Sequence, residues 1–229
     1  MSDESAVSIR ILSYNVRHAQ GVVSLPSNAR TARAIAAIAP SVAGLQEVWK
    51  FRSFDQPKLL AALTGLQGHF HETHTTLAGG IGNLVLSSGR THGIELLSLG
   101  GRREARGCLL ADVEVAGTRF VFGVTHLSLH RQTRSQQLEL LAEELPRDVP
   151  LILVGDFNCL YGELDPLSRR LSFSADPPRT YPSVLPFRAL DHVGLSEHWE
   201  LLKLVAWPSF ASDHLPLVAD VRLRDQVPA

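Results

Sequence analysis

The segment PSFASDHLPLVADV (residues 208–221) ends in an apolar run that is typical of a buried β-strand. The entrance to this run nevertheless carries two ionisable residues side by side, Asp213 and His214. Burying a charged group costs several kcal/mol unless a partner compensates it. We therefore expect the strand to hold this pair at the edge of a core, where it serves a functional site.

Similar strand-like runs recur along the chain, each closed by turn-forming residues. With the opening run, they span residues 7–16, 41–49, 81–88, 93–99, 108–115, 119–127, 150–158, 189–195, 200–207 and 215–223. The segment EVAGTRF (114–120) joins two of these runs through a short turn with Gly117, which predicts a hairpin. The sheets are therefore expected to be mixed and not purely parallel.

Helical patterns are fewer. They cover NARTARAIAAIA (28–39), PKLLAALTG (57–65) and RQTRSQQLELLAEEL (131–145). The last has an apolar stripe, Leu138, Leu141 and Leu145, opposite a polar face with Arg134, Glu139 and Glu143. Many strands with few helices predict an α/β fold in which two mixed β-sheets pack face to face with the helices outside.

We expect a single domain over residues 9–224, with tails at 1–8 and 225–229, because no linker or repeat interrupts the pattern. The Pro-rich segment SADPPRTYPSVLPF (174–187) is the longest irregular stretch, and we expect it to be a surface loop.

The composition is that of a folded protein in water, with 45% hydrophobic and 20% charged residues. A net charge of −1 provides no global positive field for nucleic acid. The start, MSDESAVSIR, lacks the features of a signal peptide, and no apolar run is long enough for a transmembrane segment. The two cysteines, Cys108 and Cys159, form no disulfide framework. These features favour a cytoplasmic protein.

Polar residues end several of the predicted strands, where a core would not select them. They are Asn15, Glu47, His126, Asp156, Asn158, Asp191, Asp213 and His214. Each has a structural explanation by itself, such as a turn for GDFN (155–158). Together they supply the oxygen ligands, amide donors and tunable histidines that a metal-dependent phosphoryl hydrolase needs. We expect them to face a common cleft.

The order of these motifs resembles that of the endonuclease/exonuclease/phosphatase superfamily, which shares the deoxyribonuclease I fold. The motifs are SYNVR, LQEV, GNLVLS, THLSL, GDFN, TYPS, ALDHV and SDHLPL, from about Ile9 to Val221. The resemblance implies a four-layer α/β sandwich. It also implies a phosphodiesterase or phosphatase that depends on Mg²⁺, or on Mn²⁺ in its place, and that hydrolyses phosphate esters with a histidine-activated water.

The resemblance also implies a role for each site residue. Metal binding falls to Glu47, with Asn15 and Asp213 on the metal side, and Asn15 is also placed next to the phosphate. Binding of the phosphate and the attacking water falls to Asp156 and Asn158. The base, or else a cationic clamp on the phosphate, is His214, whose ring Asp191 would orient. A second histidine that stabilises or protonates the departing oxygen is His126.

Two positions bear on the substrate. Some abasic-site endonucleases of this superfamily carry an acid where this chain has Arg17, so a second metal near Asn15 is not expected. In GGRREARG (100–107), Arg106 precedes a predicted strand and is the arginine we expect to bind substrate. Candidate substrates are small phosphate esters, lipid headgroups and nucleic acid. The oligomeric state stays open.

Three alternatives remain. The chain could be a nuclease acting on DNA or RNA, or a catalytically inactive binding module on the same fold, although the motif residues are all present. The segment HFHETHTT (69–76) has the histidine spacing of the metallo-β-lactamase zinc motif, in His69, His71 and His74. Thr73 replaces the Asp of that motif, so we expect these to be exposed strand histidines.

Overall fold

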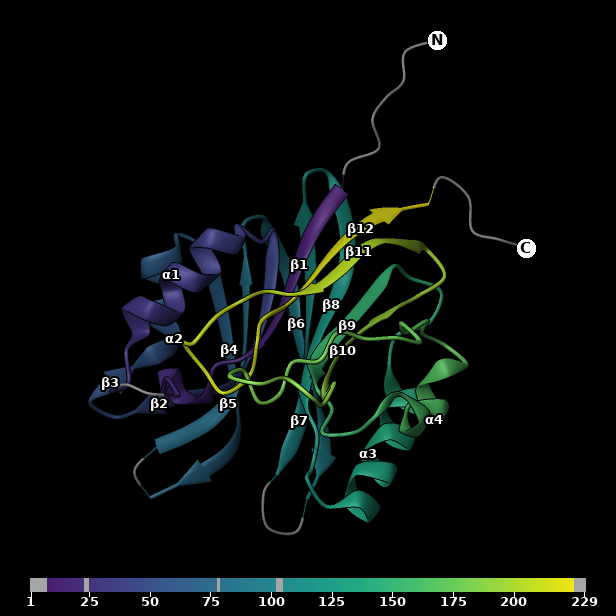
Figure 1. The fold of residues 1–229 in the computed structure, drawn as a ribbon. Coiled ribbons are helices and arrows are strands. Elements are labelled where there is room, and N and C mark those ends of the chain that lie inside the picture. Colours follow the sequence, from purple (N-terminus) through teal and green to yellow (C-terminus); the bar gives the residue numbers. More distant parts are fainter. Residues whose placement is uncertain (1–7, 23–24, 78, 102–104, 225–229) are drawn as a thin grey trace.

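The computed structural model describes residues 8–22, 25–77, 79–101 and 105–224, and within them twelve strands form two β-sheets (Figure 1). The seven-stranded sheet consists of β1 (Ser8–Asn15), β2 (Val42–Phe51), β3 (Phe54–Asp55), β4 (Gln67–Thr76), β5 (Gly79–Ser87), β11 (Trp199–Ala206) and β12 (Leu217–Leu223). Its order is β11-β12-β1-β2-β5-β4, with β3 paired to β2.

The five-stranded sheet consists of β6 (Arg90–Gly100), β7 (Arg106–Val115), β8 (Thr118–His126), β9 (Leu151–Asp156) and β10 (Asp191–Leu195). Its order is β10-β9-β8-β7-β6. The pairs β1–β2 and β8–β9 are parallel, whereas β7 and β8 form the predicted antiparallel hairpin. The expectation of mixed sheets is confirmed.

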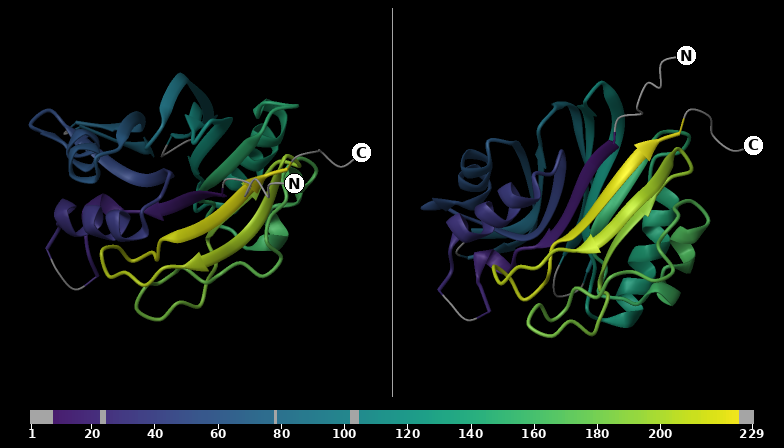
Figure 2. Two further views of the ribbon diagram at one scale, coloured as in Figure 1. Left: turned by 90° about the horizontal axis from the view of Figure 1, so that it is seen from above. Right: turned by 45° about the horizontal axis from the view of Figure 1, so that its top comes forward.

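The two sheets pack face to face, as Figure 2 shows from two directions. Apolar side chains of both sheets meet between them, among them Ile11 and Val42 from the larger sheet. A Cβ atom at Gly44 would lie 2.6 Å from methyl groups of Val124 and Val154. The central strand β2 thus approaches the opposite sheet so closely that only glycine fits there.

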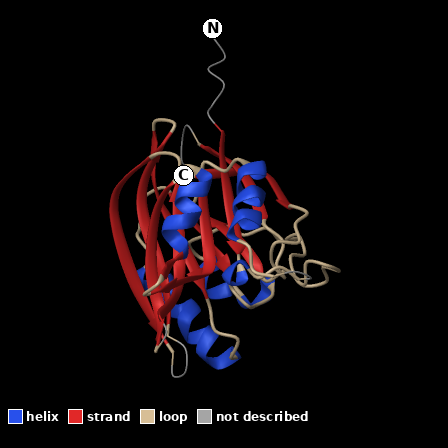
Figure 3. Cartoon of the chain, turned by 90° about the vertical axis from the view of Figure 1, so that its left-hand side faces the viewer, coloured by secondary structure: helices blue, strands red, loops and turns tan. Residues whose placement is uncertain are grey.

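The helices cover the outer faces of the two sheets (Figure 3). On the larger sheet, α1 (Asn28–Ile38) and α2 (Gln56–Thr64) bury Ile35 and Leu60 against strand residues such as Leu12. On the smaller sheet lie α3 (Arg131–Glu144) and α4 (Asp165–Ser168). The result is the predicted four-layer sandwich.

The predicted ends of α1 and α2 have the expected local chemistry. Ser27 accepts a hydrogen bond from the Arg30 backbone and caps α1, which ends at Ala39 in a left-handed conformation. Asp55 caps α2, which ends at Gly65 with φ 71°. These caps explain why periodicity located both helices well.

The polar face predicted for α3 is wrong at one residue, Arg134, which is buried. Its guanidinium donates to the carbonyls of Ser128 and Leu129 at 3.1 and 2.9 Å and pairs with Glu163 at 3.0 Å. The first turn of α3 packs under the loop that follows β8, and these acceptors compensate the buried charge. Helical periodicity does not show such a contact.

The segment 174–187 contains no helix or strand, as predicted, but part of it is buried. Thr180 has no exposed surface and Ser183 is 6% exposed. Ser183 donates its backbone N–H to the Asp213 carbonyl at 2.7 Å. The loop is therefore fastened to the segment that carries Asp213 and His214.

Candidate active site

Strand register places three of the predicted residues side by side at one end of the smaller sheet. Asp156, at the end of β9, is paired with His126 on β8 and with Asp191 on β10. All three side chains are buried or nearly so. The sheet itself therefore fixes their spacing, which is how a fold preorganises a site.

Asn15 connects this group to the larger sheet. Its Nδ2 donates to Glu47 Oε1 at 2.9 Å and to Asp156 Oδ2 at 3.0 Å, while its Oδ1 accepts from the Arg17 backbone at 3.1 Å. The amide thus positions two carboxylates, one from each sheet. Its predicted contact with a metal or phosphate stays a prediction.

Glu47 lies where the backbone of strand β2 is locally distorted. The register of β2 against β5 shifts between Leu45 and Val48, and Glu47 has φ 56°. The left-handed conformation costs a residue with a Cβ about 1–2 kcal/mol. Bulges of this kind often re-aim a side chain next to an active site. Here the Glu47 carboxylate lines the cleft.

His214 is held by Asp191, as the sequence predicts. Its Nδ1 lies 2.8 Å from Asp191 Oδ2, and Thr180 Oγ1 donates to the same oxygen at 2.5 Å. Burial lowers the pKa of His214, but the charge and hydrogen bond of Asp191 outweigh it and, with Asp156 and Asp213, raise the pKa to about 10. The ring is therefore an imidazolium at neutral pH.

His126 has the opposite environment. Its Nδ1 lies 2.9 Å from Arg106 Nη1, and its Nε2 lies 3.1 Å from Asn158 Nδ2. Burial lowers its pKa well below the ordinary value, and the positive charge of Arg106 lowers it further. The ring is therefore neutral. The predicted role of Arg106 in substrate binding remains untested, and the residue contacts a site histidine.

Asp156 lies between the two histidines. Its Oδ2 is 3.5 Å from His126 Nε2 and 3.6 Å from His214 Nε2. Burial raises the pKa of this carboxyl to about 7, although the His214 charge and the hydrogen bonds from Asn15 and Asn158 oppose the rise. A group with such a pKa can accept a proton near neutral pH.

Asp213 and Asn158 complete the predicted set. Asp213 is partly exposed and pairs with Arg17, with 3.4 Å between Arg17 Nε and Asp213 Oδ2. Asn158 has φ 52°, and its backbone N–H donates to Asp156 Oδ1 at 3.0 Å. The position where some relatives carry an acid is thus a cation that faces Asp213.

A cleft of about 510 Å³ joins these residues. Six of the eight predicted strand-end residues line it, namely Glu47, His126, Asp156, Asn158, Asp213 and His214. Asn15 and Asp191 lie behind them, in contact with Asp156 and His214. The expectation of a common cleft thus agrees with where the structure places these side chains.

The sequence did not indicate several residues of this cleft, among them His18, Tyr181 and Arg188. His18 stacks on Trp49 with ring centroids 4.0 Å apart, and its Nε2 lies 3.3 Å from Glu47 Oε2. Tyr181 packs on the His214 ring at 4.9 Å, and Arg188 lines the wall beside it. The motif TYPS was the available signal for Tyr181, whereas nothing local pointed to His18.

The described residues contain one cluster of ligand atoms that could hold a metal ion, formed by Asp156, Asp191 and His214 within 4.8 Å. This cluster differs from the predicted set of Glu47, Asn15 and Asp213. Because Asp191 already bonds the Nδ1 atom of a protonated His214, a metal there would have to displace a proton from that pair.

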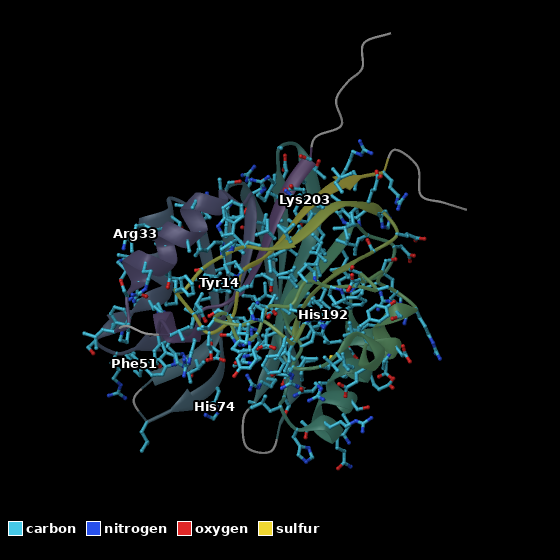
Figure 4. All side chains as sticks on the ribbon, in the orientation of Figure 1. Tyr14, Arg33, Phe51, His74, His192 and Lys203 are labelled. Carbon is cyan, nitrogen blue, oxygen red and sulfur yellow. The ribbon has the colours of Figure 1, made fainter. Side chains whose placement is uncertain are left out.

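The histidine-rich segment forms strand β4, as predicted, but its histidines are half-buried and not exposed. The register pairs His71 with Asn83 and His74 with Ile81, which places both on the inner face of the sheet. His74, labelled in Figure 4, lines the cleft. No metal-ligand cluster among the described residues includes these histidines.

A two-sheet sandwich with this polar cleft at the strand ends is the deoxyribonuclease I-like fold. The endonuclease/exonuclease/phosphatase family model matches residues 12–214, and the chain belongs to this family, whose members hydrolyse phosphate esters. No curated protein matches the chain in sequence. No helix in the described ranges is both long and apolar enough to span a membrane.

Three solved structures illustrate the likeness. An endonuclease/exonuclease/phosphatase from Beutenbergia cavernae has a TM-score of 0.82 at 22% identity, over 94% of this chain and 72% of that one. A Bacteroides thetaiotaomicron mannosyl-6-phosphatase has 0.78 at 18%, over 93% and 99%. The human Nocturnin catalytic domain with bound sulfate has 0.76 at 24%, over 95% of each. At these identities the likeness concerns the fold.

Proposed function

We propose that this protein is a Mg²⁺-dependent phosphoric ester hydrolase, a phosphodiesterase or phosphatase that also accepts Mn²⁺. The observation that carries the proposal is the Asn15 amide, which bridges Glu47 of one sheet and Asp156 of the other beside the His214–Asp191 pair. Oxygen ligands for a cation and an imidazolium for a phosphate thus lie next to each other in one cleft.

The donor chemistry fits Mg²⁺ at the predicted ligands. Glu47 and Asp213 are carboxylates whose side chains are 26% and 24% exposed, so each can contact a cation that keeps part of its water. Asn15 would hold Glu47 in place. Bound there, Mg²⁺ would act as a Lewis acid on the phosphate. The buried cluster around Asp191 is the less suitable site, because His214 already compensates its charge.

The residues of the chain have distinct parts in this proposal. The family resemblance leaves His214 as base or as cationic clamp, and its raised pKa favours the clamp on phosphate oxygens. Asp156, with a pKa near 7, is then the better acceptor for the proton of the attacking water. This assignment moves water activation from a histidine to Asp156.

The substrate is proposed at the level of class. The mannosyl-6-phosphatase among the similar structures supports a small phosphomonoester, and the sulfate in Nocturnin supports a pocket for a tetrahedral oxyanion. A net charge of −1 favours small phosphate esters or lipid headgroups over long nucleic acid. The buried free cysteines support the cytoplasmic location that we propose with it.

The test is a hydrolysis screen of the purified protein with Mg²⁺ or Mn²⁺ against sugar phosphates, nucleotides, DNA, RNA, inositol phosphates and phospholipid headgroups. We expect hydrolysis of at least one class that EDTA abolishes. Cleavage of nucleic acid alone would establish the nuclease alternative. Tight binding without turnover would identify an inactive binding module.

A further inference from the structure

The geometry points to a specific role for Arg106: it holds His126 as a neutral imidazole with its proton on Nε2, so that His126 donates a hydrogen bond in the cleft and does not act as a general acid. The catalytic consequence rests on the proposed function. The tautomer of His126 does not rest on that function, because contacts within the protein determine it without any substrate.

The first step concerns the contact at Nδ1. Arg106 Nη1 lies 2.9 Å from His126 Nδ1, which is hydrogen-bond distance. A guanidinium carries only donors and does not lose its proton in proteins. His126 Nδ1 must therefore be the acceptor, and the single proton of a neutral ring must lie on Nε2.

The second step concerns what faces Nε2. The amide nitrogen of Asn158 lies 3.1 Å from Nε2 and also donates to the Leu127 carbonyl at 3.0 Å, so it is a second donor that competes with Arg106 for the one lone pair of the neutral ring. The charged guanidinium at the shorter distance of 2.9 Å takes that lone pair, because charge-assisted hydrogen bonds are the stronger ones. Asp156 Oδ2 lies at 3.5 Å, which is longer than an ordinary hydrogen bond. Because His126 lines the cleft, its Nε2–H can bind an oxygen of a ligand there.

The third step excludes the charged ring. An imidazolium has donors at both nitrogens, so its Nδ1–H would oppose the Arg106 donor in a site where His126 is only 8% exposed. The charged groups that face the ring are Arg106, Asp156, His214 and His18. Three of these four carry or can gain positive charge, which disfavours a second imidazolium next to His214.

The chemical step then balances without a proton from His126. The attacking water forms the new O–P bond and loses a proton to the Asp156 carboxylate, which later releases it to solvent. The P–O bond to the leaving group breaks, and its electron pair stays on the leaving oxygen. His126 stabilises that oxygen through its Nε2–H, and the oxygen takes its proton from solvent.

Nuclear magnetic resonance of protein labelled with ¹⁵N-histidine, in EDTA and without substrate, tests the tautomer. The signals of His126 are identified by their loss in His126→Gln. We expect an unprotonated Nδ1 and a protonated Nε2 between about pH 5.5 and 8, the range in which an ordinary histidine titrates. A proton on Nδ1, or a charged ring at neutral pH, would overturn the inference.

Arg106→Met should free the ring to change tautomer or to gain a second proton in the same range. Arg119→Met is the matched control, because Arg119 lies on the neighbouring strand β8 and pairs with Asp112. Arg106→Lys, which keeps a donor, should restore the wild-type tautomer. An unchanged His126 spectrum in Arg106→Met would show that Arg106 does not position it.

Turnover separates a neutral donor from an acid. A Gln side chain can accept from Arg106 and donate to substrate, but it cannot supply a proton. We expect His126→Gln to retain activity within about tenfold of the wild type, whereas His126→Ala should lose about a hundredfold or more. Equal losses of turnover in the two variants would identify His126 as a general acid. If no ester is hydrolysed, the proposed function fails while the spectrum still decides the tautomer.

Discussion

The two histidines on either side of Asp156 are the same side chain in opposite states. His214 contacts the carboxylate of Asp191 through Nδ1, and its pKa is raised to about 10. His126 contacts the guanidinium of Arg106 through the same atom, and its pKa is lowered. Both Nε2 atoms lie at nearly the same distance from Asp156 Oδ2. Burial lowers the pKa of both rings, and the partner at Nδ1 decides whether this lowering is reinforced, as in His126, or overcome, as in His214.

The largest effect is expected at Glu47, on strand β2 of the larger sheet. Glu47→Gln removes a charged ligand and should nearly abolish Mg²⁺-dependent turnover while the fold and both histidines stay unchanged. Calorimetric Mg²⁺ titration should show weaker binding, with Glu95→Gln on β6 as control. Wild-type activity at limiting Mg²⁺ would contradict the assignment of Glu47 as the metal ligand.

Of the two histidines, the charged one, His214, should contribute more to turnover than the neutral His126. His214→Ala should lower turnover on the order of a hundredfold or more, since it removes a positioned cation from the phosphate. His92→Ala, which does not line the cleft, is the control. If His126→Gln is the more damaging of the two histidine changes, the division between cation and neutral donor is wrong.

Asp191→Asn should show a smaller but clear loss of turnover, because an amide cannot compensate the imidazolium and can present the wrong atom to its Nδ1. Groups that act as a unit are not additive, so the double variant with His214→Ala should be little worse than His214→Ala alone. Losses that multiply would mean that Asp191 does not act through His214.

The ion pair of His214 and Asp191 also leads to a prediction for the stability of the fold. The folded pKa of His214, about 10, lies above the value of 6.5 for a free histidine, so its contribution is complete below about pH 6.5. The contribution is lost as the pH rises through the folded value. Urea unfolding in EDTA should show this loss between these pH values in the wild type but much less of it in Asp191→Asn. Parallel curves for the two proteins would contradict the pairing.

The smallest effect is expected on strand β4. Replacing His69, His71 and His74 together by Gln should leave the Mg²⁺-dependent rate within a few fold, because these residues form no ligand cluster with the described residues. His74 contributes only to the cleft wall. Stoichiometric zinc that is lost together with activity in this variant would favour the zinc alternative.

The fold could be predicted largely because its elements have local signatures. Apolar runs closed by turns located the main strands, and caps such as Ser27 and Asp55 marked the helices. The bulge at Glu47 could not be predicted, since nothing in GLQEV indicates a residue with φ 56°. Arg134 was misplaced for a related reason, because its burial depends on carbonyls of another segment.

The sequence by itself determined which chemical groups the site contains, because motif residues such as Glu47, Asp156 and His214 lie at the ends of recognisable strands. Only the tertiary structure decided what state those groups are in. The ring of His126 is neutral because the fold buries it and brings Arg106 to its Nδ1. The ring of His214 is charged because Asp191, 23 residues away in the chain, reaches the Nδ1 atom of His214. A pKa depends on burial and on neighbouring charges, and both arise only when distant segments pack together.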